Sequence, residues 1–262
     1  MFSFVYKDID FAHKLDRASS PNDEYDKHLH VFVELLYFVS GSVIYHVEGR
    51  EKKLQKGDLV LIAPGKYHFA EVDRGALYER YVFKFPTSIL PSHIDFESLS
   101  EDPFFIADPL ISRQIKTLDS WMGRFEGDDA YVLATGSIAS LLIFLSHLRT
   151  DGGAQTSDKI TSEIIEYIDR HIQEPLTLET IAADLHFSSS YLVSRFKKEM
   201  KTTIMKYVRS KKIVLAHALI ASGAKPHEVA ETLSFEDYST FYRCYTKMLG
   251  EPPSGSRKRT DN

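Results

Sequence analysis

The sequence predicts an α+β multidomain protein: a small antiparallel β-barrel with accompanying helices, followed by an all-helical domain. Two observations predict this class. Short apolar segments separated by glycine turns fill the first 85 residues, and one helical pattern occurs twice between residues 176 and 249. A length of 262 residues suits two domains, and an apolar content of 43% is enough for two cores.

The predicted strands come first in the chain. The longest covers residues 28–39, where alternate side chains share a face. One face combines polar and apolar residues, namely His28, His30, Phe32, Glu34 and Leu36. Further strands are expected at residues 2–6, 43–48, 59–62, 69–70 and 77–85. Short strands with tight turns favour an antiparallel barrel or a jelly roll.

Two helices are expected after the strands. Asp108-Pro109 begins one that runs to about residue 125, because proline suits the first helical position. Residues 127–129 begin another that extends to about residue 148 and is apolar on nearly every side, so it must be buried in the core or against a partner chain. The Gly- and Ser-rich segment 151–157 is expected to link domains at 1–150 and 158–262.

The repeat lies in the second domain. Ile181 and Phe187 recur as Val229 and Phe235, each pair 48 residues apart. Each copy predicts a short helix, a tight turn at the phenylalanine, and a second helix capped by a serine or an aspartate. This is a helix-turn-helix, whose second helix enters the major groove of DNA.

Residues 203–222 predict one continuous helix between the copies. About 20 residues rising about 1.5 Å each span about 30 Å, close to the roughly 34 Å of one DNA turn. Such a helix could place two reading helices in successive major-groove segments on one side of a duplex.

The outward face of each second helix supplies candidates for DNA contact. Small, polar and basic residues there are candidates for base contact: Ser189, Ser190, Ser194, Arg195, Tyr238, Ser239, Thr240 and Arg243. Lysines nearby are candidates for phosphate contact, chiefly Lys198 and Lys247, with Lys197, Lys206, Arg209 and Lys211 as further ones. The alternative is that these side chains form a solvated helix face.

The charge distribution agrees with a DNA-binding second domain. The whole chain carries a net charge of −5, but residues 158–262 hold 16 Lys and Arg against 14 Asp and Glu. The remaining residues hold 16 against 23. The asymmetry is modest, so affinity for DNA must come from where the basic residues lie rather than from bulk charge.

Residues 176–257 resemble the DNA-binding domain of the AraC/XylS family of bacterial transcription regulators. The matching motif runs from Leu178 through Lys212-Ile213-x-x-Ala216 to Gly250-Glu251-Pro252-Pro253-x-x-x-Arg257. The family has glycine at three positions that are His186, Lys201 and Ser234 here. Arg243 matches a family arginine, whereas Arg195 is displaced by one residue, which turns its side chain by about 100°.

Residues 25–85 resemble the cupin barrel at the N-terminus of many AraC-type regulators. His28-x-His30-x-x-x-Glu34, followed by Gly41, is similar to the first cupin motif. Gly57 through Pro64-Gly65-x-x-His68 is similar to the second, whose closing asparagine is Val72 here. The resemblance implies helices that often mediate homodimerisation, and RNA polymerase as a partner.

The barrel supplies the candidates for ligand contact: His28, His30, Glu34, Tyr45, His68 and Tyr81. Three interpretations stay open. These residues line a small-molecule pocket without metal; His28, His30, Glu34 and His68 bind a divalent metal; or they have no ligand role. The first is favoured, because regulatory cupins commonly lack metal, and no other cofactor is expected.

These features predict a sequence-specific transcription regulator that binds double-stranded promoter DNA and is controlled by a small-molecule effector, with a carbohydrate as the class that the resemblance suggests. An enzyme is not expected. The alternatives are a metal-dependent cupin enzyme with an appended helical domain, and a constitutive regulator whose barrel only dimerises. The N-terminus lacks a signal pattern and polar residues interrupt the apolar stretch 132–148, so a cytoplasmic protein without a membrane span is expected.

Overall fold

The computed structural model describes residues 1–18, 27–148 and 158–254, so the expected linker at 151–157 and the motif residue Arg257 lie outside the described residues. The chain divides into two compact units. The first comprises Met1–Asp26, Phe32–Pro64 and His68–Gln155, and the second comprises Thr156–Asn262 with the short segments Lys27–Val31 and Gly65–Tyr67.

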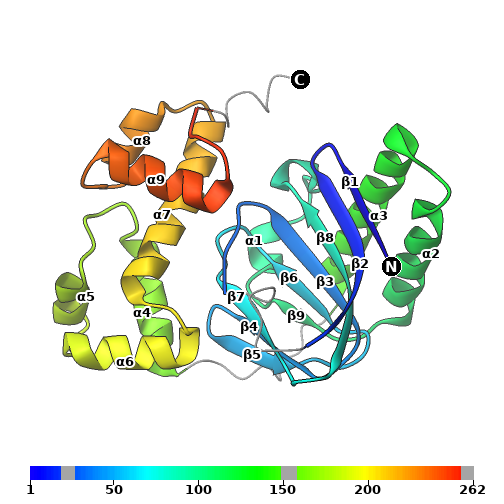
Figure 1. Cartoon of the computed structure of the whole chain (residues 1–262), viewed down its shortest axis with the longest axis horizontal. Helices are drawn as coiled ribbons and strands as arrows, with labels where there is room; N and C mark the ends of the chain where they lie inside the picture. Colours follow the sequence, from blue (N-terminus) through cyan, green and yellow to red (C-terminus); the bar gives the residue numbers. More distant parts are fainter. Residues whose placement is uncertain (19–26, 149–157, 255–262) are drawn as a thin grey trace. The chain divides into compact units, whose positions relative to one another are not determined.

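Two antiparallel sheets form the first unit (Figure 1). The larger sheet has the order β1 (Phe2–Tyr6), β2 (Ile9–Arg17), β8 (Leu77–Phe85), β3 (Val33–Ser40), β6 (Leu59–Ile62) and β9 (Phe104–Phe105). The smaller has the order β5 (Arg50–Lys53), β4 (Val43–Val47) and β7 (His68–Val72). The strand predicted over residues 28–39 is regular only from Val33, because the chain bends at Val31 and Phe32.

The larger sheet is apolar on both faces. Leu35 and Phe83 join the core that the helices cover, together with Ile111 and Ile138. The neighbouring residue Leu36 lies on the opposite face, in the core that the smaller sheet completes. Burial on both sides explains why β3 reads as a continuous apolar run rather than as an alternating one.

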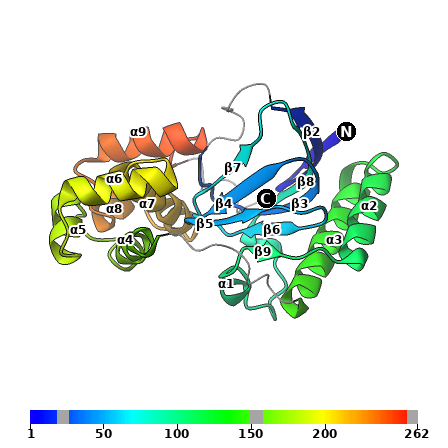
Figure 2. The same ribbon diagram turned by 90° about the horizontal axis from the view of Figure 1, so that it is seen from below.

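Helices α1 (Phe96–Leu99), α2 (Pro109–Met122) and α3 (Gly127–His147) follow the strands, with a 3-10 turn at Thr87–Ile89. Asp108 caps α2 by accepting hydrogen bonds from the backbone N–H groups of Leu110 and Ile111, as predicted. Figure 2 shows α2 and α3 side by side against the larger sheet. By length and composition α3 alone among the described helices could cross a membrane, but here it buries one face in the core.

The second unit is all helical. It contains α4 (Lys159–Arg170), α5 (Leu178–Asp184), α6 (Ser189–Met200), α7 (Ile204–Ala221), α8 (Pro226–Thr232) and α9 (Tyr238–Leu249). Helices α5 and α6 form the first helix-turn-helix, here called the first head, and α8 and α9 form the second head. Figure 1 shows α7 running from one head to the other, so the predicted connecting helix is confirmed to within a residue at each end.

Candidate DNA interface and effector site

The two heads share one turn geometry. Phe187 N–H donates to Ala182 O at 3.0 Å, and Phe235 N–H donates to Ala230 O at 3.0 Å. This is the hydrogen bond of a Schellman motif, which requires a left-handed residue just before the phenylalanine. His186 and Ser234 fill that position with φ of 60° and 52°. The turn therefore keeps the geometry that glycine serves in the family, although neither head has a glycine there.

Helix α6 of the first head presents a face of small polar residues. Ser188 caps the helix by accepting from Tyr191 N–H at 3.3 Å, while Leu192 and Phe196 are buried. Ser190 and Ser194 are exposed and Ser189 is partly exposed. Arg195 lies beside this face, but its guanidinium donates to Asp158 at 3.2 Å. A base contact by Arg195 would require this ion pair to break.

Helix α9 of the second head presents a different surface. Phe241 and Tyr245 are buried, and Tyr238, Ser239 and Arg243 are exposed. Thr240 is partly exposed, and its hydroxyl donates a hydrogen bond to the Asp237 carboxylate. Arg243 is thus an exposed cation on this face, with aromatic and hydroxyl neighbours suited to base edges and phosphates.

A short chain of hydrogen bonds orients Arg243. The carboxylate of Asp237 caps α9 by accepting from Thr240 N–H at 2.7 Å, and it also accepts from the Thr240 hydroxyl at 2.9 Å. Arg243 donates to that hydroxyl at 3.3 Å. The backbone and side-chain hydrogen bonds from Thr240 hold the pKa of Asp237 below its ordinary value. The charged carboxylate can only accept hydrogen bonds, so the Thr240 hydroxyl donates to Asp237 and accepts from Arg243.

The basic residues divide into an exposed and an internal group. Lys197, Lys198, Lys206, Arg209 and Lys247 are exposed. Lys211 instead pairs with Asp169 at 2.8 Å, and its side chain is only 13% exposed. The sequence offered Lys211 as a phosphate contact, whereas its charge is used within the domain.

The inner face of the barrel carries polar side chains. Glu34 and His68 are buried beside Tyr45, whose ring stacks on His68 with centroids 6.3 Å apart. Burial raises the pKa of Tyr45 well above its ordinary value, and the charge of Glu34 raises it further. A carboxylate, a phenol and an imidazole in an apolar setting can direct hydrogen bonds to a small polar molecule.

The four candidate metal ligands are divided between the two units. His28 and His30 belong to the second unit, and Glu34 and His68 belong to the first. The Glu34 carboxylate lies 3.9 Å from the ammonium group of Lys84. Imidazole and carboxylate groups suit a divalent transition metal, and the metal interpretation stays a prediction.

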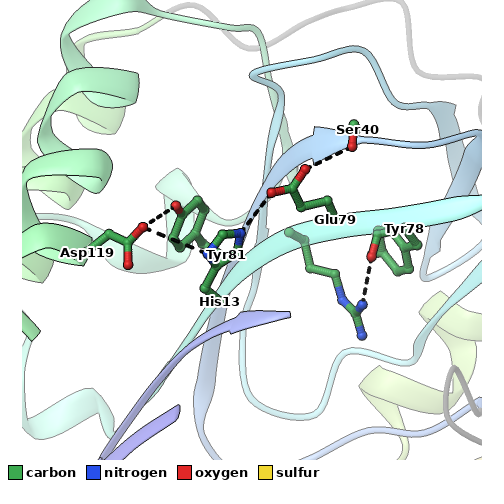
Figure 3. A network of polar contacts seen from close by, with 7 residues as sticks. His13, Ser40, Tyr78, Glu79, Tyr81 and Asp119 are labelled. Carbon is green, nitrogen blue, oxygen red and sulfur yellow. Dashed lines mark hydrogen bonds and ion pairs between the residues drawn. The ribbon is translucent and has the colours of Figure 1, made fainter. Parts of the chain in front are cut away.

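Tyr81 lies on the other face of the larger sheet, within a polar network (Figure 3). Its hydroxyl donates to Asp119 of α2 at 2.6 Å, and its ring stacks on His13 at 4.2 Å. His13 contacts Glu79 at 2.9 Å and lies 3.8 Å from Asp119, while Ser40 donates to Glu79 at 3.1 Å. The Tyr81 side chain thus connects the sheet to α2.

Sequence reasoning missed both this network and Arg80. Arg80 lies between Tyr78 and Val82 on β8, is buried, and pairs with Asp16. Its guanidinium lies 4.2 Å from the centre of the Tyr78 ring. A charged residue in a strand is read as solvent-facing from sequence alone, and the partner that would show otherwise is 64 positions away.

Two family models match separate parts of the chain. Residues 13–119 match the family model of the AraC-like ligand binding domain, and residues 181–259 match that of a helix-turn-helix domain. The regulatory protein SoxS of Escherichia coli K12 is 28% identical over 102 residues, which cover 38% of this chain and 95% of SoxS.

Two relatives align over most of both chains. The uncharacterized HTH-type transcriptional regulator YobQ of Bacillus subtilis is 23% identical over 87% of each chain. The arabinose operon regulatory protein of Escherichia coli K12 is 22% identical over 84% of this chain and 78% of its own. The solved structure of ToxT from Vibrio cholerae O395 has a TM-score of 0.43 at 12% identity, covering 96% of this chain and 98% of ToxT. The chain belongs to the AraC/XylS family: it is a DNA-binding transcription regulator with an N-terminal ligand-binding domain.

Proposed function

We propose that this regulator binds two successive major-groove segments of promoter DNA, and that a small molecule in the barrel controls the binding. It acts in the cytoplasm, as a homodimer and together with RNA polymerase. The observation that carries the proposal is the pair of heads with matching turns at the ends of α7. The 18 residues of α7 span about 27 Å at about 1.5 Å per residue.

The second head contributes most of the base discrimination in this proposal. Arg243 is exposed and oriented through Thr240, and arginine is the residue that most often reads guanine in the major groove. The first head contributes hydroxyls from Ser189, Ser190 and Ser194, because Arg195 is paired with Asp158. Exposed Lys198 and Lys247 contact phosphates, which position the protein without reading sequence.

The effector is a small polar molecule held by Glu34, Tyr45 and His68, and His28 and His30 stay further candidates for contact with it. Carboxylates and phenols that point into an apolar barrel suit the hydroxyl groups of a carbohydrate, the class that the resemblance suggests. The effector can change the affinity for DNA only as far as it binds the two arrangements of the protein differently.

The homodimer forms through the outer face of α2 and α3. Leu110 and Val132 are 53% and 66% exposed there, and Phe144 is 38% exposed. They border a groove of about 460 Å³ that also includes Trp121 and Gly136. An apolar face of this kind is usual for a protein interface, and a second copy of the chain would bury it.

Selection of bound duplexes from random DNA with the full-length chain tests this function. We expect one enriched motif with two separated blocks, and an affinity that changes when carbohydrates are added one at a time. Enrichment of no motif would overturn DNA recognition. A motif whose affinity no added molecule changes would leave a constitutive regulator whose barrel only dimerises.

A second candidate for the effector is a divalent metal ion, because His28, His30, Glu34 and His68 have side chains that bind such ions. Metal analysis of the purified protein is the corresponding measurement. Stoichiometric zinc, iron or manganese that is lost in His30→Ala would favour the metal, and a metal-free protein with intact effector response would exclude it.

A further inference from the structure

We propose that Lys212 and Ser234 are positioning residues that hold the two heads in one relative orientation. They thereby set the spacing between the two DNA segments that the protein accepts. The inference rests on the proposed function and adds to it a determinant of specificity that contacts no base.

Lys212 joins the two heads through one ammonium group. It lies on α7, and its side chain is buried. Its Nζ donates to the carbonyl oxygen of Glu174 at 2.8 Å and to that of Leu233 at 2.7 Å. Glu174 belongs to the loop at residues 171–177, which leads into the first head, and Leu233 is the C-cap of α8 in the second head.

Ser234 makes a second connection to the same loop. Its hydroxyl donates to Gln173 O at 2.9 Å, and its backbone is left-handed. The loop is itself braced, because Glu174 N–H donates to His171 O at 2.9 Å and the Glu174 carboxylate contacts the His171 ring at 2.9 Å. The turn of the second head is thus fixed to the entry of the first head at two adjacent points.

The chemistry of Lys212 suits a residue that positions the heads better than one that only fills space in the core. Burial lowers the pKa of Lys212, which means that the site disfavours the charged form. An unbranched apolar side chain would occupy this space without that cost. What only the ammonium provides is a pair of directional bonds, one to the loop that leads into the first head and one to the second head. The Leu233 carbonyl lies at the C-terminal end of α8, where a cation is favoured.

Orientation matters because the heads otherwise share a single helix. Among the described residues α7 packs on α6, α8 and α9, and a helix of this length can bend. One inserted base pair turns the second DNA segment by about 35° and moves it by about 3.4 Å. Heads in a fixed orientation can match only one spacing, whereas heads that move about α7 can match several.

The test uses two variants and a matched control in the full-length chain. Lys212→Met keeps an unbranched side chain that is one heavy atom shorter and removes both bonds, while Ser234→Gly removes the hydroxyl and relieves the left-handed backbone. His186→Gly relieves the same backbone conformation in the first head. Within the described residues no side-chain bond joins His186 to the second head, so this variant is the control.

The probe is a duplex selected with the wild-type chain, together with duplexes that carry one or two base pairs more or fewer between the protected segments. We expect the wild type and His186→Gly to lose about tenfold in affinity per step of spacing. The Lys212→Met and Ser234→Gly double variant should lose about threefold or less across the series. Thermal melts identify which variants are folded, and Ser234→Gly carries the test if Lys212→Met unfolds.

A spacing preference in folded variants equal to that of the wild type would overturn the inference and leave the proposed function intact. A wild-type chain that protects no DNA, or a single segment, would overturn the proposed function and the inference together.

Discussion

At the scale of single residues, three side chains adopt left-handed backbone conformations where the AraC/XylS family has glycine. His186, Lys201 and Ser234 have φ of 60°, 51° and 52°. This conformation costs a residue with a Cβ roughly 1–2 kcal/mol relative to glycine. The turn geometry could be predicted from the sequence because Phe187 and Phe235 mark the corner, although the glycines that usually accompany it are absent.

His186→Gly should therefore raise the free energy of unfolding by about 0.5–1 kcal/mol, since glycine loses part of the gain through its greater freedom in the unfolded chain. Urea unfolding of the full-length chain measures the change. Lys197→Gly, at an exposed site within α6, is the control and should cost about 1 kcal/mol. A destabilised His186→Gly would contradict this account of the turn.

Asp237 gives the second head a dependence on pH. Its pKa in the folded state lies below the unfolded value, so its contribution to stability is present above the unfolded pKa and is lost as pH falls through the folded pKa. Asp237→Asn keeps a good N-cap but removes the titrating group. The melting temperature of the wild type should fall more steeply below about pH 4 than that of the variant. Equal slopes would show that the cap does not depend on charge.

Arg243→Ala should weaken specific binding by about 1–3 kcal/mol and relax discrimination at one base position. Binding to a panel of duplexes with single substitutions measures both effects. Lys247→Ala is the control, and it should weaken binding to all duplexes alike and reduce the salt dependence. An unchanged sequence preference in Arg243→Ala would remove this residue from base reading.

At the scale of elements, polar contacts between distant segments are what the sequence could not predict. Helix α7 was predictable, because its apolar residues recur at helical spacing and Thr203 caps it. The two partners of Lys212 lie 38 and 21 positions away in the sequence, and the partner of Arg80 lies 64 positions away. The sequence pattern alone predicts that such charged residues are exposed to solvent. Strand alternation shows which residues of a strand share a face of the sheet. It does not show which of the two faces the helices cover. Tyr81 was a ligand candidate, but it lies on the face that the helices cover.

Two tyrosine hydroxyls hold α2 against the sheet, and their partners differ in charge. Tyr81 donates to the Asp119 carboxylate at 2.6 Å, and Tyr37 contacts the Ser112 hydroxyl at 2.7 Å. Bonds to charged groups contribute about 1.5–3 kcal/mol and neutral ones about 0.5–1.5 kcal/mol. We expect Tyr81→Phe to lower the free energy of unfolding more than Tyr37→Phe does, as measured in urea. The reverse order would show that Asp119 draws its support from His13 rather than from Tyr81.

At the scale of the whole molecule, the two units have separate cores and separate tasks. The barrel brings buried polar groups to one face of a sheet, and the helical unit holds two heads on one helix. In a regulator, effector binding to the barrel must change the affinity of the helical unit for DNA. The free energy of that change equals the difference in effector binding free energy between the DNA-binding arrangement of the protein and the other arrangement. The family resemblance predicts both tasks, whereas the identity of the effector depends on details of the barrel lining.

The central claim is that one chain reads two groove segments through heads fixed about one DNA turn apart. Hydroxyl-radical footprinting of the full-length chain on a selected duplex tests it most directly. We expect two protected blocks on one side of the duplex with centres about 10 base pairs apart, and Arg243→Ala should weaken only the block under the second head. A single protected block, or two blocks on opposite sides of the duplex, would contradict the account.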